Sequence, residues 1–191
     1  PGQYFACCGL FETAELLAPG SSACFAEEGR TFWLSTEAHL PPKDLRLRPS
    51  AGKWMGVTLE PLVVEVNGVP LSVDWWLNET HSDKSRLKTW GGQQTPRGIL
   101  GELLGLLDAN IVFEQLPTFP VFTKTRLGVD ARSAWEALDA GYSPNDLNQE
   151  AVTYPWVEVL AALGLQGFRP GQEKRDRLYA VWLTPLTLAP A

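Results

Sequence analysis

The sequence predicts an α+β domain in which an antiparallel sheet has its helices mainly on one face. Turn signals at residues 27–29 and 67–68 indicate hairpins, whereas apolar segments at 3–17, 96–108 and 155–163 have helical spacing. Because hairpins alternate with short helices, an antiparallel sheet of about five or more strands is favoured over a parallel βαβ sheet. A ferredoxin-like arrangement is one form that such a domain takes.

Length and composition indicate one globular domain. The 191 residues correspond to a single domain over 1–191, or to one with a smaller C-terminal lobe from about residue 111. An apolar content of 45% and a charged content of 20% exclude wholesale disorder. No apolar run approaches the ~18 residues of a membrane helix. The odd cysteine count, with Cys7 and Cys8 adjacent, indicates a reducing cytoplasm and core thiols rather than disulfides.

The N-terminal part of the chain predicts a helix followed by a hairpin. The helix covers 3–17 and ends at a Pro-Gly pair. The hairpin has strands at 23–26 and 30–35 with Phe25, Phe32 and Leu34 on the inner face. Glu27 and Glu28 lie in its turn and point apart, so we expect solvated turn residues rather than an acid and a base.

A loop and a second hairpin follow. The segment 39–49 is rich in proline and basic residues, and we expect either a plain connector or a second basic contact. Its basic residues are Lys43, Arg46 and Arg48. Strands at 57–66 and 69–76 flank an Asn-Gly turn, and Pro70 places the second of them at an edge.

The C-terminal half predicts further short elements. The helix at 96–108 contains three glycines, which predict close packing against another backbone. Strands are expected at 111–113, 125–129 and 178–183, and the helix at 155–163 is expected to end at a glycine.

The segment 84–97 holds four basic residues and no carboxylate, although the whole chain has a net charge of −6. Lys84, Arg86 and Lys88 recur with period two, so an extended segment projects them about 6.6 Å apart, roughly one nucleotide step. We expect them to contact successive phosphates. The alternative is an edge strand kept soluble by its charges.

A loop and a helix start follow these basic residues. Trp90 either stacks on a base or anchors the loop in the core. Two glycines then either let two glutamines reach sugar or base edges or make an ordinary turn. Thr95 and Pro96 predict a helix start whose free N–H groups attract anions. The candidate nucleic-acid-binding residues are therefore Lys84, Arg86, Lys88, Trp90, Gly91, Gly92, Gln93, Gln94 and Arg97.

Catalytic motifs are absent from the sequence. His39 and His81 have no metal-ligand spacing, and neither a Cys-x-x-Cys pair, a Walker phosphate loop nor a dinucleotide fingerprint occurs. Cys8 and His81 could pair as nucleophile and base, but the apolar helical surroundings of Cys8 are typical of a buried, inert thiol. We therefore expect a noncatalytic binding or assembly subunit that has no metal and no cofactor.

Four stretches together indicate a family. They are residues 1–10 with Glu12, Ala14 and Leu16, residues 74–76, residues 87–94, and residues 154–155 with Glu158, Leu160 and residues 163–165. Spread over most of the chain, they resemble the smaller accessory subunit of type I-U (also called I-G) CRISPR effector systems.

The resemblance implies a noncatalytic member of a Cascade-like surveillance complex in antiviral defence, with other effector subunits, guide RNA and target DNA as partners and no membrane. Such subunits hold nucleic acid through backbone and shape. Many ferredoxin-like Cascade subunits have a glycine-rich loop near the C-terminus, whereas residues 178–191 contain no glycine. The alternative is a purely structural protein–protein adaptor whose tryptophan-rich patches pack against partner subunits without touching nucleic acid.

Overall fold

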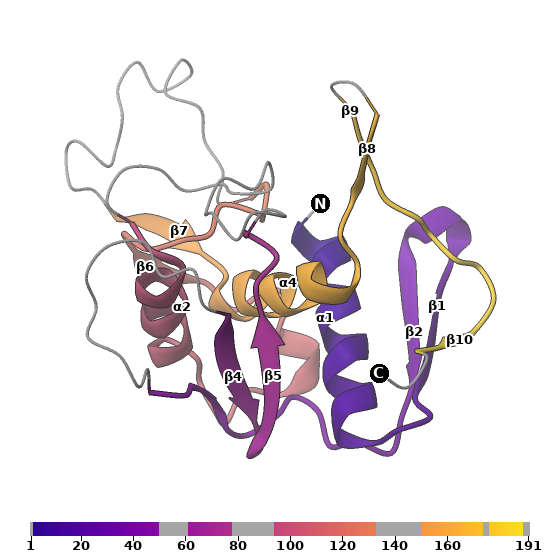
Figure 1. Cartoon of the computed structure of the whole chain (residues 1–191), viewed down its shortest axis with the longest axis horizontal. Helices are drawn as coiled ribbons and strands as arrows, with labels where there is room; N and C mark the ends of the chain where they lie inside the picture. Colours follow the sequence, from indigo (N-terminus) through magenta and orange to yellow (C-terminus); the bar gives the residue numbers. More distant parts are fainter. Residues whose placement is uncertain (1, 50–60, 78–93, 133–149, 174–175, 189–191) are drawn as a thin grey trace.

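A pair of packed helices forms the centre of the fold. The ranges that the computed structural model describes are residues 2–49, 61–77, 94–132, 150–173 and 176–188. Within them α1 (Gly2–Leu17) packs against α4 (Pro155–Gly167). Figure 1 shows α1 between the hairpin of one three-stranded sheet, β4–β5, and the hairpin of another, β1–β2.

The α1–α4 contact brings two backbones together without side chains between them. A Cβ atom added to Gly9 would lie 1.9 Å from the carbonyl oxygen of Leu160, and one added to Gly164 would lie 2.1 Å from the carbonyl oxygen of Phe5. Glycine is therefore required at both crossing positions. Gly164 does not end the helix as expected from the sequence, because its role is to admit α1, and α4 continues to Gly167.

The first sheet has the strand order β10-β1-β2. The expected hairpin is present as β1 (Ser22–Ala26) and β2 (Thr31–Ser35), joined by the short 3₁₀ turn η1 (Glu27–Gly29). The C-terminal β10 (Leu186–Thr187) pairs with the other side of β1. Phe25 of β1 stacks on Tyr4 of α1, with the ring centroids 5.3 Å apart, so this sheet packs on α1 through its buried face.

The second sheet has the order β3-β4-β5, with strands β3 (Leu45–Leu47), β4 (Leu62–Val66) and β5 (Val69–Val73). The Asn-Gly hairpin is confirmed, and β5, which contains Pro70, is an edge strand as predicted. The strand is shorter than the expected 69–76, because residues 74–77 form a turn closed by the bond from the Leu77 N–H to the Asp74 carbonyl. The segment 39–49 is not all loop. Leu45 and Leu47 alternate and pack against the core, which makes the end of the segment a strand.

Several predicted elements differ from those in the structure. The helix α2 (Pro96–Gly105) ends earlier than expected, and its glycines are not crossing points, because a Cβ on Gly101 would make only ordinary contact with a leucine side chain at 3.7 Å. No strand forms at 111–113 or 125–129. The turn η2 (Phe113–Gln115) begins at the end of the first range, and a strand forms between the two ranges instead: β6 (Val121–Thr123), which pairs with β7 (Ala151–Thr153).

The expected strand at 178–183 is also absent as a unit. Its first residue ends β9 (Asp176–Leu178), which pairs with β8 (Gly171–Glu173). Beyond it an irregular segment runs past β1, held by a backbone bond from the Phe25 N–H to the Trp182 carbonyl at 2.8 Å and a side-chain bond from the Trp182 Nε1–H to the Ala23 carbonyl at 2.7 Å. A single backbone hydrogen bond does not form a β-ladder.

The α+β class with antiparallel pairing is confirmed. The paired strands in the described ranges form four small sheets, and α1 lies between two of them instead of on one face of a single larger sheet. Of the predicted elements, residues 57–60 and the polar segment 141–149 lie outside the described ranges.

Candidate functional site

The helix start predicted beside the basic segment is present. Thr95 has extended φ/ψ, and its Oγ1 accepts a hydrogen bond from the Gly98 N–H at 3.1 Å, while Pro96 occupies the first helical position. Gln94 precedes the cap and is exposed. The N-terminal end of α2 is therefore capped and carries the positive end of the helix dipole, which favours a nearby anion.

Arg97 lies in the first turn of α2, and its side chain is half-buried. Its Nη1 donates a hydrogen bond to the Arg48 carbonyl oxygen at 3.1 Å, and its buried Nε has no partner among the described residues. The guanidinium is therefore held against the end of β3. Of the nine candidate residues only Gln94 and Arg97 lie in the described ranges; outside them are Lys84, Arg86, Lys88, Trp90, Gly91, Gly92 and Gln93.

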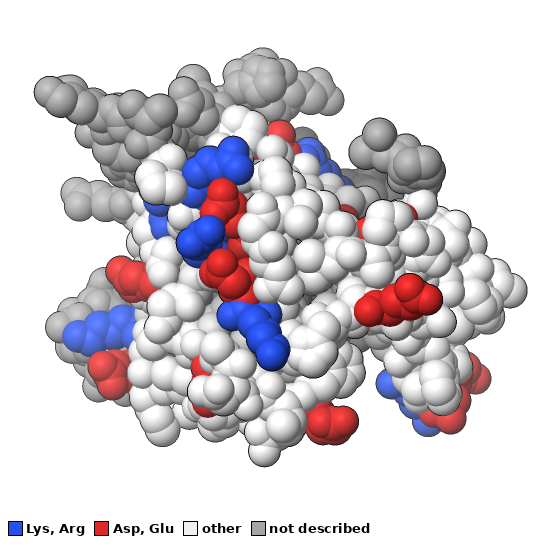
Figure 2. Space-filling view, turned by 90° about the horizontal axis from the view of Figure 1, so that it is seen from below, with Lys and Arg blue, Asp and Glu red and all other residues white. Residues whose placement is uncertain are grey.

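The arginines of β3 and its end are engaged within the chain. Arg46 Nε lies 2.9 Å and Arg48 Nε 3.1 Å from the carboxylate of Glu65 on β4. Hydrogen bonds from Arg48 and Arg46 lower the pKa of Glu65. Figure 2 shows blue and red side chains alternating in a row beside a broad uncharged area. These arginines are therefore less suited to a second basic contact than the sequence suggested.

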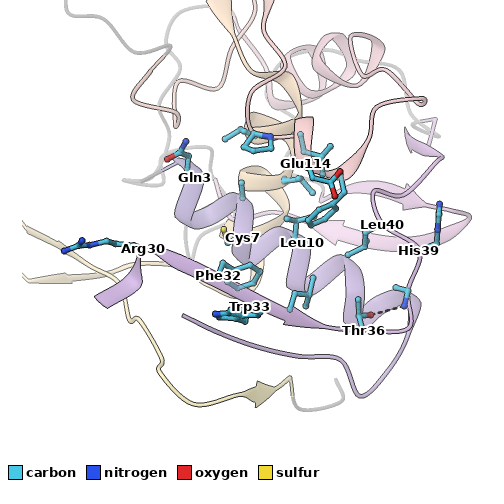
Figure 3. Close-up of a pocket in the computed structure, with 18 residues that line it drawn as sticks. Gln3, Cys7, Leu10, Arg30, Phe32, Trp33, Thr36, His39, Leu40 and Glu114 are labelled. Atoms are coloured by element: carbon cyan, nitrogen blue, oxygen red, sulfur yellow. Dashed lines mark hydrogen bonds between the residues drawn. The ribbon is translucent and has the colours of Figure 1, made fainter. Parts of the chain in front are cut away.

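A groove between α1, β2 and η2 is a feature that the sequence did not predict. Its volume is about 800 Å³, and Figure 3 shows side chains from all three elements around it. Its wall is mainly apolar, and the apolar residues include Ala6, Leu10, Phe32, Leu34, Phe113 and Leu160. The charged side chains that line it are Arg30 and Glu114. A hollow of this kind suits a ligand or partner with apolar side chains.

Cys7 lies on the α1 wall of the groove (Figure 3). Burial raises the pKa of its thiol to about 11, and burial together with other groups raises that of Cys8 to about 12. Both groups are therefore protonated at neutral pH, which opposes nucleophilic chemistry. This agrees with the expectation that Cys8 is a core residue, since its side chain is fully buried.

Exposed apolar side chains surround the groove. Trp33 on β2 is 63% exposed, and Phe113 at the start of η2 is 43% exposed. Other tryptophans behave differently: Trp75, Trp76 and Trp156 are in the core. The sequence contained a signal for the exposed Trp33. Phe32, Trp33 and Leu34 are consecutive, and a strand cannot turn three successive side chains to one face.

A buried carboxylate organises the loop after β6. Glu158, in the first turn of α4, is fully buried and accepts N–H bonds from Leu127 at 2.7 Å, Gly128 at 2.9 Å and Asp130 at 3.0 Å. Burial raises its pKa. Asp130 in turn binds the guanidinium of Arg132 at 2.6 Å. These bonds keep residues 127–130 irregular, which is why the strand expected at 125–129 does not form.

Three further findings bear on function. Within the part of the chain described, no His, Cys, Asp and Glu side chains are grouped so as to hold a metal ion. No described helix combines the length and apolar character needed to cross a membrane. Comparison with models of protein families, with curated proteins and with solved structures found no match.

Proposed function

We propose that this chain is a noncatalytic subunit of a type I-U (I-G) CRISPR RNA-guided surveillance complex, which contacts guide RNA or target DNA in cytoplasmic antiviral defence. The resemblance of the four stretches supports the complex. The observation that carries the nucleic-acid contact is the start of α2, where the exposed Gln94, the Thr95 cap and the basic Arg97 follow the other basic residues in the sequence. A helix start next to cations favours a phosphate backbone.

The residues have separate roles in this proposal. Lys84, Arg86 and Lys88 contact successive phosphates, which set the register of the bound strand without reading its sequence. Gln93 and Gln94 contact sugar or base edges. This division suits a subunit that holds a guide whose sequence is read by base pairing.

The experiment replaces Lys84, Arg86 and Lys88 together by alanine and measures guide and target binding over a range of salt concentrations. Each lost phosphate contact reduces the slope of log affinity against log salt by about one unit, uniformly across sequences. The matched control is Lys124→Ala, which removes an exposed cation elsewhere. Unchanged affinity and slope, with folding and assembly intact, would assign the three residues to a solvated edge strand.

The second candidate function, a protein–protein adaptor, is favoured by the apolar groove and its exposed rim. The net charge of −6 also suits it. Phe113→Lys places a charge on the groove rim and distinguishes the two functions. In an adaptor it reduces co-purification of partner subunits and leaves nucleic-acid affinity unchanged. Phe122→Lys is the control, because Phe122 is 69% exposed on β6 and does not line the groove.

A further inference from the structure

β2 is an edge strand without the usual protection of an edge. In the described sheet β10-β1-β2 it is paired only with β1. The strand Thr31–Ser35 contains no charged residue and no proline, the two common devices that prevent edge-to-edge pairing. Its sequence is instead apolar at three successive positions, 32–34.

The backbone groups on the free side of β2 follow from the pairing of β1. The Phe25 N–H bonds the Trp182 carbonyl, and the Trp182 Nε1–H bonds the Ala23 carbonyl, so Ala23 and Phe25 face away from β2. Successive residues of a strand point their N–H and C=O groups to opposite sides. Cys24 therefore faces β2 and exchanges backbone hydrogen bonds with its register partner Trp33. The N–H and C=O groups of Phe32 and Leu34 therefore point out of the sheet edge.

The apolar side chains beside this edge are also partly or largely exposed to solvent. Phe32 and Leu34 are half-buried against the groove, whereas Trp33 projects from the other face of the strand, is 63% exposed and reaches the rim of the groove (Figure 3). An added strand would cover apolar surface on both faces as well as satisfy four backbone groups. Its own residues must then be apolar at three successive positions, which is the pattern of β2 itself.

Charged residues flank both ends of β2. Arg30 precedes the strand and Glu37 follows it, and both are exposed. The present contact of Arg30 is with Glu28 at 3.5 Å, an exposed pair that contributes little. The turn before the strand also carries Glu27 and Glu28, so the complementarity is between single residues: when β2 runs antiparallel to its own copy, Arg30 of each chain comes near Glu37 of the other.

We propose that β2 pairs antiparallel with β2 of a second copy of this chain, forming a two-fold symmetric dimer with a continuous six-stranded sheet. Phe32 of each copy lies opposite Leu34 of the other, and these residues exchange the four backbone hydrogen bonds. Trp33 lies opposite Trp33 of the second copy at a non-hydrogen-bonded position, where side chains are closest. In this register Arg30 lies opposite Thr36 of the second copy, one residue from its Glu37, at each end.

The test is the association state of the 191-residue chain, measured by sedimentation from roughly 1 to 500 µM, a range that covers weak interfaces. The parent chain is expected to form a reversible dimer. Trp33→Lys places two like charges opposite each other on the two-fold axis and removes the aromatic pair, so it weakens the dimer about tenfold or more. Phe122→Lys, on another sheet, leaves the dimer unchanged.

A charge exchange tests the register. Arg30→Glu and Glu37→Arg each bring like charges together and weaken self-association. A mixture of the two variants restores it, because each forms an ion pair with the other. A chain that stays monomeric at every concentration overturns the proposal and leaves this edge to a different protein. A dimer that Trp33→Lys does not weaken, or that Phe122→Lys weakens equally, also overturns it. Circular dichroism confirms that the exposed substitutions leave the fold intact.

Discussion

The crossing of α1 and α4 predicts a large loss of stability for Gly9→Ala. The added methyl carbon would lie 1.9 Å from the Leu160 carbonyl oxygen, whereas ordinary contact begins at 3.4 Å. The obstructing atom belongs to a helix backbone and cannot rotate away. The helices must therefore separate by about 1.5 Å along this direction, which forfeits more than half of the dispersion attraction across the contact.

The expected destabilisation is about 3 kcal/mol or more, at or beyond the upper end of the usual overpacking range. For a chain of this length it corresponds to a fall in melting temperature of about 6 °C or more. The assay is urea unfolding followed by tryptophan fluorescence, since Trp156 of α4 is buried. Gly164→Ala acts on the same contact, so the double variant loses less than the sum of the two single losses.

Gly101→Ala is the matched control. Gly101 is an exposed interior position of α2, where the new methyl group makes ordinary contact with Leu47 at 3.7 Å. It is expected to stabilise the chain by about 0.5–1 kcal/mol through helix propensity. If Gly9→Ala lies within about 1 kcal/mol of the parent chain, the close approach of the two helices is refuted.

Three further changes have defined outcomes. Burial raises the pKa of Glu12 from 4.5 to about 8, so the folded chain binds the proton more tightly and loses stability as pH rises between these values. Glu12→Gln removes this dependence. The measurement is the free energy of unfolding in urea at pH 5 and at pH 8. An equal change between the two pH values in the parent chain and in Glu12→Gln would contradict the prediction. Glu158→Gln exchanges an acceptor oxygen for a donor beside buried N–H groups and lowers the stability of the fold by about 1–3 kcal/mol. The expected observation is faster hydrogen exchange at the Leu127 amide, whose N–H bonds this carboxylate. Thr95→Ala removes the α2 cap and costs about 1 kcal/mol in the same unfolding assay; a loss below about 0.3 kcal/mol would count against the cap.

Local signals in the sequence determined the elements whose residues interact with near neighbours. The Asn-Gly turn between β4 and β5, the Glu-Glu-Gly turn between β1 and β2, and the Thr-Pro start of α2 were all predicted and are all present. Each depends on backbone conformations and caps that a few adjacent residues specify. The same reasoning placed the helix start, with Gln94 and Arg97, next to the basic segment.

Tertiary contacts decided the rest, because they join residues that are far apart in the chain. Gly164 looks like a helix end in the sequence, and only the approach of α1 makes it an interior crossing point. The loop at 127–130 alternates like a strand, but its N–H groups bond the buried carboxylate of Glu158 from another helix. The groove likewise depends on how α1, β2 and η2 pack, a geometry that no local pattern specifies.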